Sequence, residues 1–442
     1  MSMAAADRRI SRARGRPESA DPFVVTSLFL LFAIGSWRIQ FVGTLPLYEL
    51  AFVPLLLVML VVRRGGFPGG AVAMTIFGAG AAWFAAQAAS DWINETAAFD
   101  SIRGLANIAV FLLTIFVWRL ILSDVRHGLL AAGLGLCVGA FIQALLQPDQ
   151  YQQTDVWKFG LGHPMTFAVA LLVGHSRLNG RLPASLVLVG LAILHFSFGS
   201  RTLAAASFLA GFMTFVLGAR SLSQRANVMG MAVVALGIAV AAIGAQVAYQ
   251  WALESPLMPQ KMRSKFESQA ASDLGLILSA RSELLVSTKA IREKPWIGYG
   301  SWARDEGFAN ELLLLRLASG QSMLTAYVED DYIPSHSHIF GAWVQAGLVG
   351  ALFWAYALVL LAVALWRLGP TARPEGIAQS YLLLTFAWDV LFSPLSLGSR
   401  VWSALAVAVL VSLASPDKDA SRRAIARGRR AAPGNPARAL GG

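Results

Sequence analysis

The chain has 442 residues, of which 56% are hydrophobic and only 14% are charged. A soluble domain carries about a quarter charged residues, so this composition excludes an ordinary soluble enzyme. The net charge is +11, but the basic residues lie in short segments between apolar blocks, where they set membrane orientation; no nucleic-acid partner is expected. The single cysteine, Cys137, excludes an intramolecular disulfide and a cysteine-based zinc site.

Apolar blocks follow one another along the chain, each of the length that crosses a bilayer as a helix. We predict an all-α, polytopic membrane protein with about 12 transmembrane helices. The predicted spans are 23–40, 43–62, 70–90, 105–122, 128–147, 161–175, 182–198, 202–218, 227–248, 337–366, 376–394 and 400–414.

Five regions follow from these spans. A basic N-terminal segment (1–22) precedes the first nine spans (23–248), and the large loop (249–335) precedes the last three (336–414). The tail (415–442) is rich in Arg, Ala, Gly and Pro, which predicts disorder. The N-terminal segment is polar and lacks the pattern of a signal peptide.

The distribution of Lys and Arg predicts the orientation. If both termini are cytoplasmic, the cytoplasmic segments hold 22 of the 36 basic residues and the short external segments hold five. This bias is the positive-inside pattern, so the large loop is expected outside the membrane. The predicted location is therefore a bacterial inner membrane, with both termini in the cytoplasm.

The large loop has features of an ordered region. An amphipathic stretch from Ser282 to Glu293 precedes Pro295-Trp296-Ile297-Gly298-Tyr299-Gly300, and a second helical stretch runs from Phe308 to Leu317. Long loops in compact proteins are usually functional or disordered, and the apolar and aromatic content here favours order. An acidic run, Glu329 to Asp331, either binds a divalent ion or forms a solvated patch.

Polar groups at the ends of spans are the candidate functional residues. Arg201 lies at a tight turn, either snorkelling to the interface or binding an anion. His336 and His338 lie where the large loop enters the tenth span, and His163 and His195 also lie at external span ends. Each is either an interfacial histidine or a ligand, and a neutral histidine there is suited to act as a general base.

Several classes of chemistry are disfavoured. His336 and His338 lie two residues apart without a carboxylate at ligand spacing, so no metal is expected. No phosphate-binding loop or dinucleotide fingerprint is present, and the intracellular loops are too short for a nucleotide domain. A substrate is therefore expected to be carried by lipid or to lie outside.

Three segments resemble the O-antigen ligase/polymerase superfamily. These segments are Gly199-Ser200-Arg201, then Arg281-Ser282-Glu283 with the Pro-x-x-Gly-x-Gly stretch 295–300, then His336-Ser337 with Gly347-Leu348-Val349-Gly350. The match covers about 198–354. Ser337 and Gln345 stand where the family commonly has Asn and Glu.

The resemblance implies a glycosyltransferase C-like membrane fold and a metal-independent, inverting glycosyltransferase without a cofactor. The donor would be a polyprenyl-diphosphate-linked glycan, with a flippase and a chain-length regulator as partners. His336 would be the catalytic base, and Arg201 and Arg281 would stabilise the leaving diphosphate. The residues that would bind substrate are His338, His163, His195 and Tyr332. Without the resemblance, Arg281 would be interpreted as a solvated surface charge.

Other functions stay open at this point. The acceptor distinguishes an O-antigen ligase from an exopolysaccharide or O-antigen polymerase, and both from a protein oligosaccharyltransferase. A transporter or flippase of lipid-linked sugars also fits twelve spans, although polarity here collects at one external face rather than at mid-membrane. A non-catalytic glycolipid-binding subunit would keep the arginines without needing His336.

Overall fold

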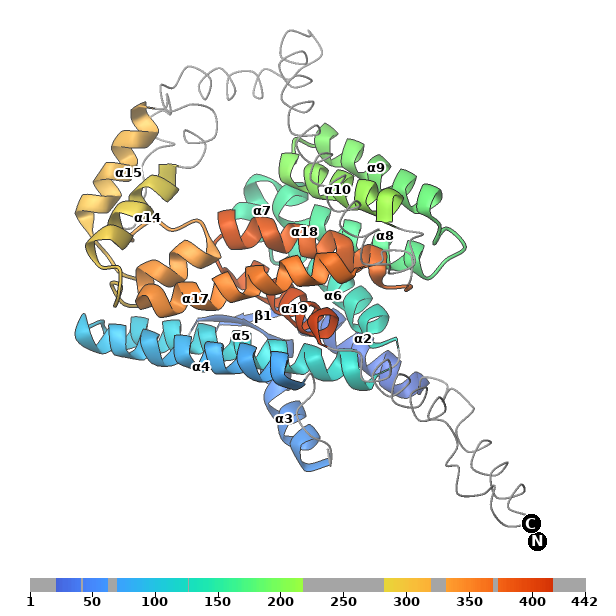
Figure 1. Ribbon diagram of the computed structural model, residues 1–442, viewed down its shortest axis with the longest axis horizontal. Helices are drawn as coiled ribbons and strands as arrows, with labels where there is room; N and C mark the ends of the chain where they lie inside the picture. The colour runs from blue at the N-terminus through green and yellow to red at the C-terminus, as the bar shows by residue number, and fades with distance from the viewer. Residues whose placement is uncertain are drawn as a thin grey trace, which may run out of the picture.

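The structure of this chain is a computed structural model that describes residues 21–40, 43–62, 70–125, 127–217, 282–318, 331–368 and 373–415, with side chains from 58 to 62 excepted. The described part is almost entirely helical (Figure 1). Its helices are α2 (Pro22–Gly35), α3 (Leu47–Val62), α4 (Gly70–Ile93), α5 (Ala98–Asp124), α6 (Gly128–Leu146), α7 (Gln150–Thr154), the π-helix η1 (Trp157–Leu161), α8 (Gly162–Gly174), α9 (Arg181–Ser197), α10 (Arg201–Leu217), α14 (Ser282–Glu293), α15 (Glu306–Ala318), α17 (His338–Arg367), α18 (Gly376–Phe392) and α19 (Leu397–Ala414).

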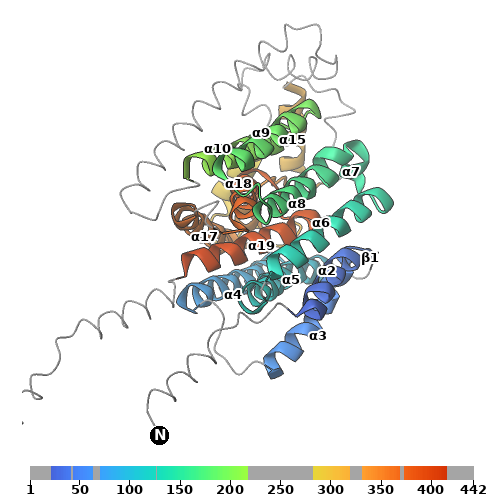
Figure 2. The ribbon, with the colours of Figure 1, turned by 90° about the vertical axis from the view of Figure 1, so that its right-hand side faces the viewer.

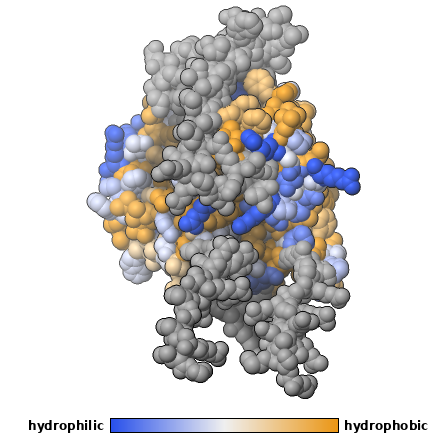
Figure 3. Space-filling view, turned by 45° about the vertical axis from the view of Figure 1, so that its right-hand side comes forward, coloured by the Kyte–Doolittle hydropathy of each residue, from blue (hydrophilic) through white to orange (hydrophobic). Residues whose placement is uncertain are grey.

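Five of these helices, α4, α5, α6, α17 and α19, are long and apolar enough to cross a membrane, judged by length and composition. Shorter apolar helices occupy five other predicted spans, and the 13-residue α8 occupies the predicted span 161–175. The predicted span 227–248 and the tail lie outside the described residues. Large apolar side chains are also exposed: Leu186 and Ile193 of α9 are 61% and 64% exposed. Figure 3 shows apolar residues over much of the visible face. These properties are those of an all-α protein whose outer surface contacts lipid.

The first predicted span, 23–40, is wrong in its last five residues. Helix α2 ends at Gly35, and residues Arg38–Gln40 (β1) pair antiparallel with Thr44–Pro46 (β2). A Cβ at Gly35 would lie 2.8 Å from that of Tyr48, so the start of α3 packs directly against the end of α2. The chain reverses its direction between α2 and α3 at the β1–β2 pair. Hydropathy alone cannot detect this reversal because the helices on both sides of it are apolar.

Helix α19 forms the centre of the core. Every residue from Ala404 to Leu410 is fully buried or nearly so, and α19 packs against α5, α17 and α18 (Figure 2). Beside it, the rings of Trp83, Phe111, Phe353 and Trp354 contact one another at centroid distances of 5.1–6.3 Å. Aromatic contacts of this kind join α4, α5 and α17 into one packed unit.

A buried ion pair connects α19 to α3. The Arg400 guanidinium donates through Nε to Glu49 Oε1 at 2.9 Å, and through Nη1 to Asn107 Oδ1 at 2.6 Å. Both charged residues are at most 5% exposed. Arg400, the first residue of the last predicted span, therefore has its charge neutralised inside the protein.

Helices α17 and α18 form a hairpin that organises the candidate site. At its open end, Ser337 caps α17 and donates from Oγ to Val390 O of α18 at 2.8 Å. At its closed end, the connection between the two helices runs from the end of α17 at Arg367 to the start of α18 at Gly376. Helix α14 packs against α17 from the other side, and α15 packs on α14. The two predicted loop helices are thereby confirmed, and they lie at the open end of the hairpin.

Candidate functional site

His336 lies in an extended segment just before α17, opposite the first turn of α14. The carboxylate of Glu283 interacts electrostatically with the His336 ring. Glu283 also accepts a hydrogen bond from Arg316 Nη2 of α15 at 2.8 Å. The side chains of Glu283 and Arg316 are only 13% and 17% exposed, so the cluster is shielded from solvent.

The charge state of Glu283 follows from its surroundings. Burial alone raises the pKa of its carboxyl, but the His336 ring and the hydrogen-bonded Arg316 outweigh burial and hold the pKa below its usual range. Glu283 is therefore ionised at neutral pH. A carboxylate near a histidine ring stabilises the imidazolium that forms when the ring takes a proton.

Helix α14 is held in register with the His336 segment. Ser287 Oγ donates to Pro334 O at 2.6 Å, and Val286 packs in one apolar cluster with Ile333 and Val344. These contacts place the N-terminus of α14 beside His336. Arg281 immediately precedes α14 but lies outside the described residues, as do Glu329 and Asp330.

Arg201 begins α10 after a sharp turn. Gly199 has φ +72°, a left-handed conformation that favours glycine, and Ser200 N–H donates back to His195 O at 2.9 Å. The turn exposes the Arg201 side chain at the helix start. Because the first N–H groups of a helix lack internal partners, an arginine here sits beside groups that also favour anions.

His195 is buried under the Arg201 turn with both ring nitrogens occupied. Trp157 Nε1–H donates to Nδ1 at 3.2 Å, so Nε2 carries the proton and donates to Thr166 Oγ1 at 2.6 Å. Thr166 in turn donates to Gly162 O at 3.0 Å. The chain of hydrogen bonds fixes the turn relative to α8 and η1.

The other two histidine candidates also have internal contacts. His163 accepts from, or donates to, Tyr381 OH through Nδ1 at 3.2 Å, and its ring meets Trp402 edge-on at 4.5 Å. His338 is 2% exposed and bonds through Nδ1 to Ser393 O at 2.6 Å and through Nε2 to Ser403 Oγ at 2.9 Å. Both contacts tie helices of the core together, and substrate binding by these residues stays a prediction.

The structure therefore groups the predicted residues into two sets. His336 lies with Glu283 at the α14 side of the open end of the hairpin, whereas Arg201, His195 and their neighbours lie with α10. Helix α18 packs against both α10 and α17, so it connects the two sets. Figure 1 shows α10 and α14 on different flanks of α17 and α18.

A cavity of about 950 Å³ lies between the start of the loop region after α14 and the α4–α5 connection. Its lining mixes aromatic rings, carboxylates, cationic groups, an amide and hydroxyls. Lys294 donates to Asn94 Oδ1 at 2.8 Å and lies 4.5 Å from the Tyr299 ring centroid. The lining residues are Asn94, Thr96, Ala97, Asp100, Glu293, Lys294, Tyr299, Ser301, Trp302, Ala303, Arg304 and Asp305.

Tyr332, a predicted substrate-binding residue, lies at the rim of this cavity. Arg304 Nη2 donates to Tyr332 OH at 3.1 Å, and the Trp302 and Tyr332 ring centroids are 5.9 Å apart. Tyr299 OH donates to Glu293 Oε2 at 3.1 Å, and burial together with Glu293 raises the pKa of Tyr299, so its hydroxyl stays protonated. The rim thus offers flat rings flanked by hydrogen-bonding groups.

The glycine-rich stretch 295–300 docks onto a break in α17. Gly347 interrupts that helix with φ +66° and ψ −161°. At the break Tyr299 N–H donates to Val344 O at 2.7 Å, and Gly300 N–H donates to Gln345 O at 3.1 Å. The Pro-x-x-Gly-x-Gly stretch therefore has a structural role, because it fixes the cavity wall to α17.

Replacing Gly347 by alanine should loosen this docking. A Cβ at Gly347 would lie 2.0 Å from Trp296 O, in a backbone conformation that is nearly restricted to glycine. The strain alone costs about 1–3 kcal/mol, so we expect lower thermal stability in detergent and faster proteolysis near Trp296. The matched control is Gly190→Ala in α9, where no atom lies within 4 Å of the new Cβ. Equal stability of the two variants would contradict this account.

Sequence reasoning missed Asp91, the best-satisfied carboxylate of the region. It is 4% exposed and accepts from Ser301 Oγ at 2.9 Å, Gln87 Nε2 at 3.1 Å and Ser101 Oγ at 3.0 Å. It anchors the loop to α4 and α5. The signal in the sequence was an acidic residue inside an apolar block, which is costly unless it is paired.

The arrangement at the open end of the hairpin can move a proton and hold polar substrate beside a membrane surface. This end of the fold brings together the His336 ring, the Glu283 carboxylate that interacts with it, and a cavity with a polar and aromatic lining. Neither a known protein family nor a curated protein matches this chain.

Proposed function

We propose that this chain is a membrane glycosyltransferase that transfers a polyprenyl-diphosphate-linked glycan to an acceptor hydroxyl on the periplasmic side of a bacterial inner membrane. The observation that carries the proposal is the electrostatic interaction of His336 with the half-buried, ionised Glu283 at the end of an apolar helical bundle. The resemblance of the segments that contain Arg201, Arg281 and His336 supports the choice of substrate class.

In the proposed reaction the acceptor oxygen attacks the anomeric carbon opposite the diphosphate. The new C–O bond forms as the bond to the phosphate oxygen breaks, and the lipid diphosphate leaves with that electron pair. His336 takes the proton of the acceptor hydroxyl, and Glu283 stabilises the resulting imidazolium. Arg201 and Arg281 stabilise the charge that develops on the diphosphate, since guanidinium binds phosphate oxygens through paired hydrogen bonds.

The polyprenyl tail would stay in the bilayer, along the exposed apolar helices. The glycan would extend toward the loop, where Trp302, Tyr332 and Tyr299 offer flat surfaces for the C–H faces of sugar rings. Carboxylates and amides in the same cavity are suited to bind sugar hydroxyls. No cofactor or metal is assigned to this step, and a flippase that supplies the donor and a chain-length regulator remain proposed partners.

The acceptor decides between two forms of this function. A second lipid-linked repeat would make the protein a polysaccharide polymerase, and a lipid A-core acceptor would make it an O-antigen ligase. Both use the same donor chemistry, so the site residues are the same in either case.

Deletion of this protein from its source organism tests the proposal, with the size ladder of surface polysaccharide as the readout. Loss of long chains with single repeats still attached to the core would identify a polymerase. Long chains accumulating on the carrier lipid would identify a ligase. An unchanged ladder, in cells where the wild-type protein is demonstrably produced before deletion, would overturn the proposed function.

A further inference from the structure

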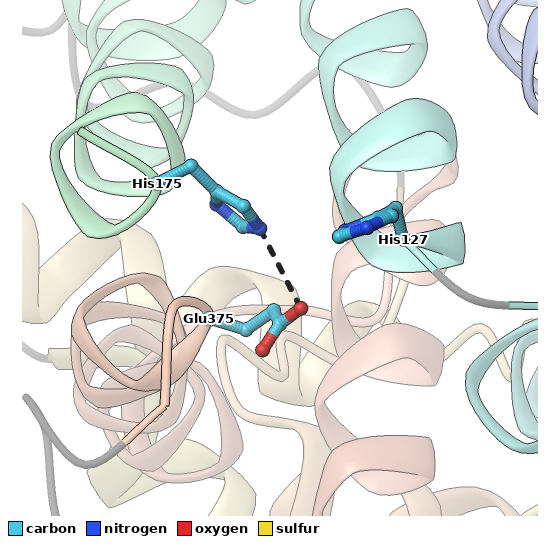
Figure 4. Close-up of side chains that lie close together, drawn as sticks. All are labelled: His127, His175 and Glu375. Atoms are coloured by element: carbon cyan, nitrogen blue, oxygen red, sulfur yellow. Dashed lines mark ion pairs between the residues drawn. The ribbon is translucent and has the colours of Figure 1, made fainter. Parts of the chain in front are cut away.

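A second cluster of titratable side chains lies at the closed end of the α17–α18 hairpin, away from His336. His127 precedes α6, His175 follows α8, and Glu375 precedes α18. Figure 4 shows the three side chains converging from three separate helix ends. Their nearest ligand atoms all lie within 4.8 Å of one another, and the His175 Nε2 to Glu375 Oε1 distance is 3.6 Å.

The hydrogen bonding of His175 presents a lone pair to the cluster. Its Nδ1–H donates to Leu171 O at 2.9 Å, which leaves Nε2 as the acceptor nitrogen. Nε2 is buried and has no hydrogen-bond partner among the described residues, and it faces a carboxylate that is also an acceptor. A proton on Nε2 or a cation bound by both groups lets these two acceptors face each other across 3.6 Å, and the zinc titration below distinguishes the two.

His127 completes the set from a constrained backbone. It has φ +60° and ψ +18°, a left-handed conformation that is uncommon for residues other than glycine. Its ring centroid lies 6.0 Å from that of His175, in an edge-to-face arrangement. Uncommon backbone conformations cluster at binding sites, where the surroundings hold them in place.

The donor set and its geometry suit a transition metal. Two imidazoles and one carboxylate are a common ligand set for zinc. Bonds of about 2.0–2.1 Å place tetrahedral ligand atoms about 3.3–3.4 Å apart, close to the His175–Glu375 separation. Metal-bound histidines are commonly oriented by a hydrogen bond from their other ring nitrogen, and the bond from His175 Nδ1 to a backbone carbonyl is of this kind.

We propose that His127, His175 and Glu375 bind one zinc-like divalent ion, which ties the ends of α6, α8 and α18 together. Helix α18 has 17 residues, so this site lies about 25 Å from the open end that holds His336. The ion would therefore hold the helix ends in place without entering the reaction. The inference does not depend on the proposed glycosyl transfer.

Zinc binding to the purified full-length chain tests this site. The protein carries no polyhistidine tag, is stripped with a chelator in detergent and is titrated with zinc by calorimetry. One ion per chain is expected, with the dissociation constant raised at least about 100-fold in His175→Ala and Glu375→Gln. The matched control is His336→Ala, which should bind zinc as the wild type does.

Cobalt substitution in the wild-type chain gives a readout that needs no variant. Cobalt bound by two imidazoles and a carboxylate in a four- or five-coordinate site gives visible d–d absorption, which zinc should then displace at one equivalent. Zinc should also raise thermal stability in the wild type, but not in His175→Ala. Absence of stoichiometric binding at micromolar zinc, or equal binding by His175→Ala and wild type, would overturn the proposal.

Discussion

Replacing His336 by alanine is expected to reduce the rate of glycan transfer about 10²- to 10⁴-fold, with the protein still folded. That range is the usual contribution of a positioned general base. His336 lies in the segment before α17 and is not among the buried residues of the core, so its removal should leave the helices packed. The measurement is the initial rate of polyprenyl diphosphate release by purified protein in proteoliposomes.

The partner carboxylate gives a sharper test of the same pair. In Glu283→Gln the imidazolium loses its nearby negative charge, so the ring deprotonates more easily. The acidic limb of the pH–rate profile should therefore move to lower pH, and the maximal rate should fall. The matched control is Glu311→Gln, which breaks the exposed Lys289–Glu311 pair on the neighbouring helix. Identical profiles for the two variants would show that Glu283 does not support the base.

Replacing Arg400 by leucine is expected to cost about 3–5 kcal/mol of stability. The change would leave the Glu49 carboxylate, which is 3% exposed, buried without its cation. Thermal unfolding in detergent and the yield of folded protein measure the loss. Glu311→Gln again serves as control, because exposed pairs contribute about 0–1 kcal/mol.

The double variant Glu49→Leu/Arg400→Leu separates two costs in Arg400→Leu: the loss of the ion pair, and the burial of an unpaired Glu49 carboxylate. Both charges are then absent, so much of the stability should return, since apolar replacements of buried pairs are often neutral. A double variant as unstable as Arg400→Leu would show that Asn107 or packing, rather than the unpaired carboxylate, determines the cost.

Apolar length predicted most of the helices because a helix that contacts lipid must satisfy its own backbone. Helices α6 and α17 begin and end within about one residue of the predicted spans. The amphipathic pattern likewise predicted α14 at 282–293. Hydropathy failed at β1–β2, where the chain reverses inside an apolar stretch, and at Gly347, where a helix breaks without leaving the apolar block.

The candidate site was less accessible to sequence reasoning. His336 was predicted from its place before a span, but its partner Glu283 lies 53 positions away and becomes its neighbour only when α14 packs on α17. The pairs Arg400–Glu49 and His175–Glu375 are further examples of contacts set by helix packing. Residues of this kind carry no local spacing pattern, so their grouping follows from the fold alone.

The most direct test of the proposed function follows both halves of the donor in one experiment. Purified protein in proteoliposomes receives a polyprenyl-diphosphate-linked glycan with labels on the glycan and on the lipid diphosphate, together with candidate acceptors. We expect free lipid diphosphate in one-to-one proportion to glycan found on the acceptor. Movement of the intact donor across the bilayer, with both labels still joined, would contradict an enzyme and identify a transporter.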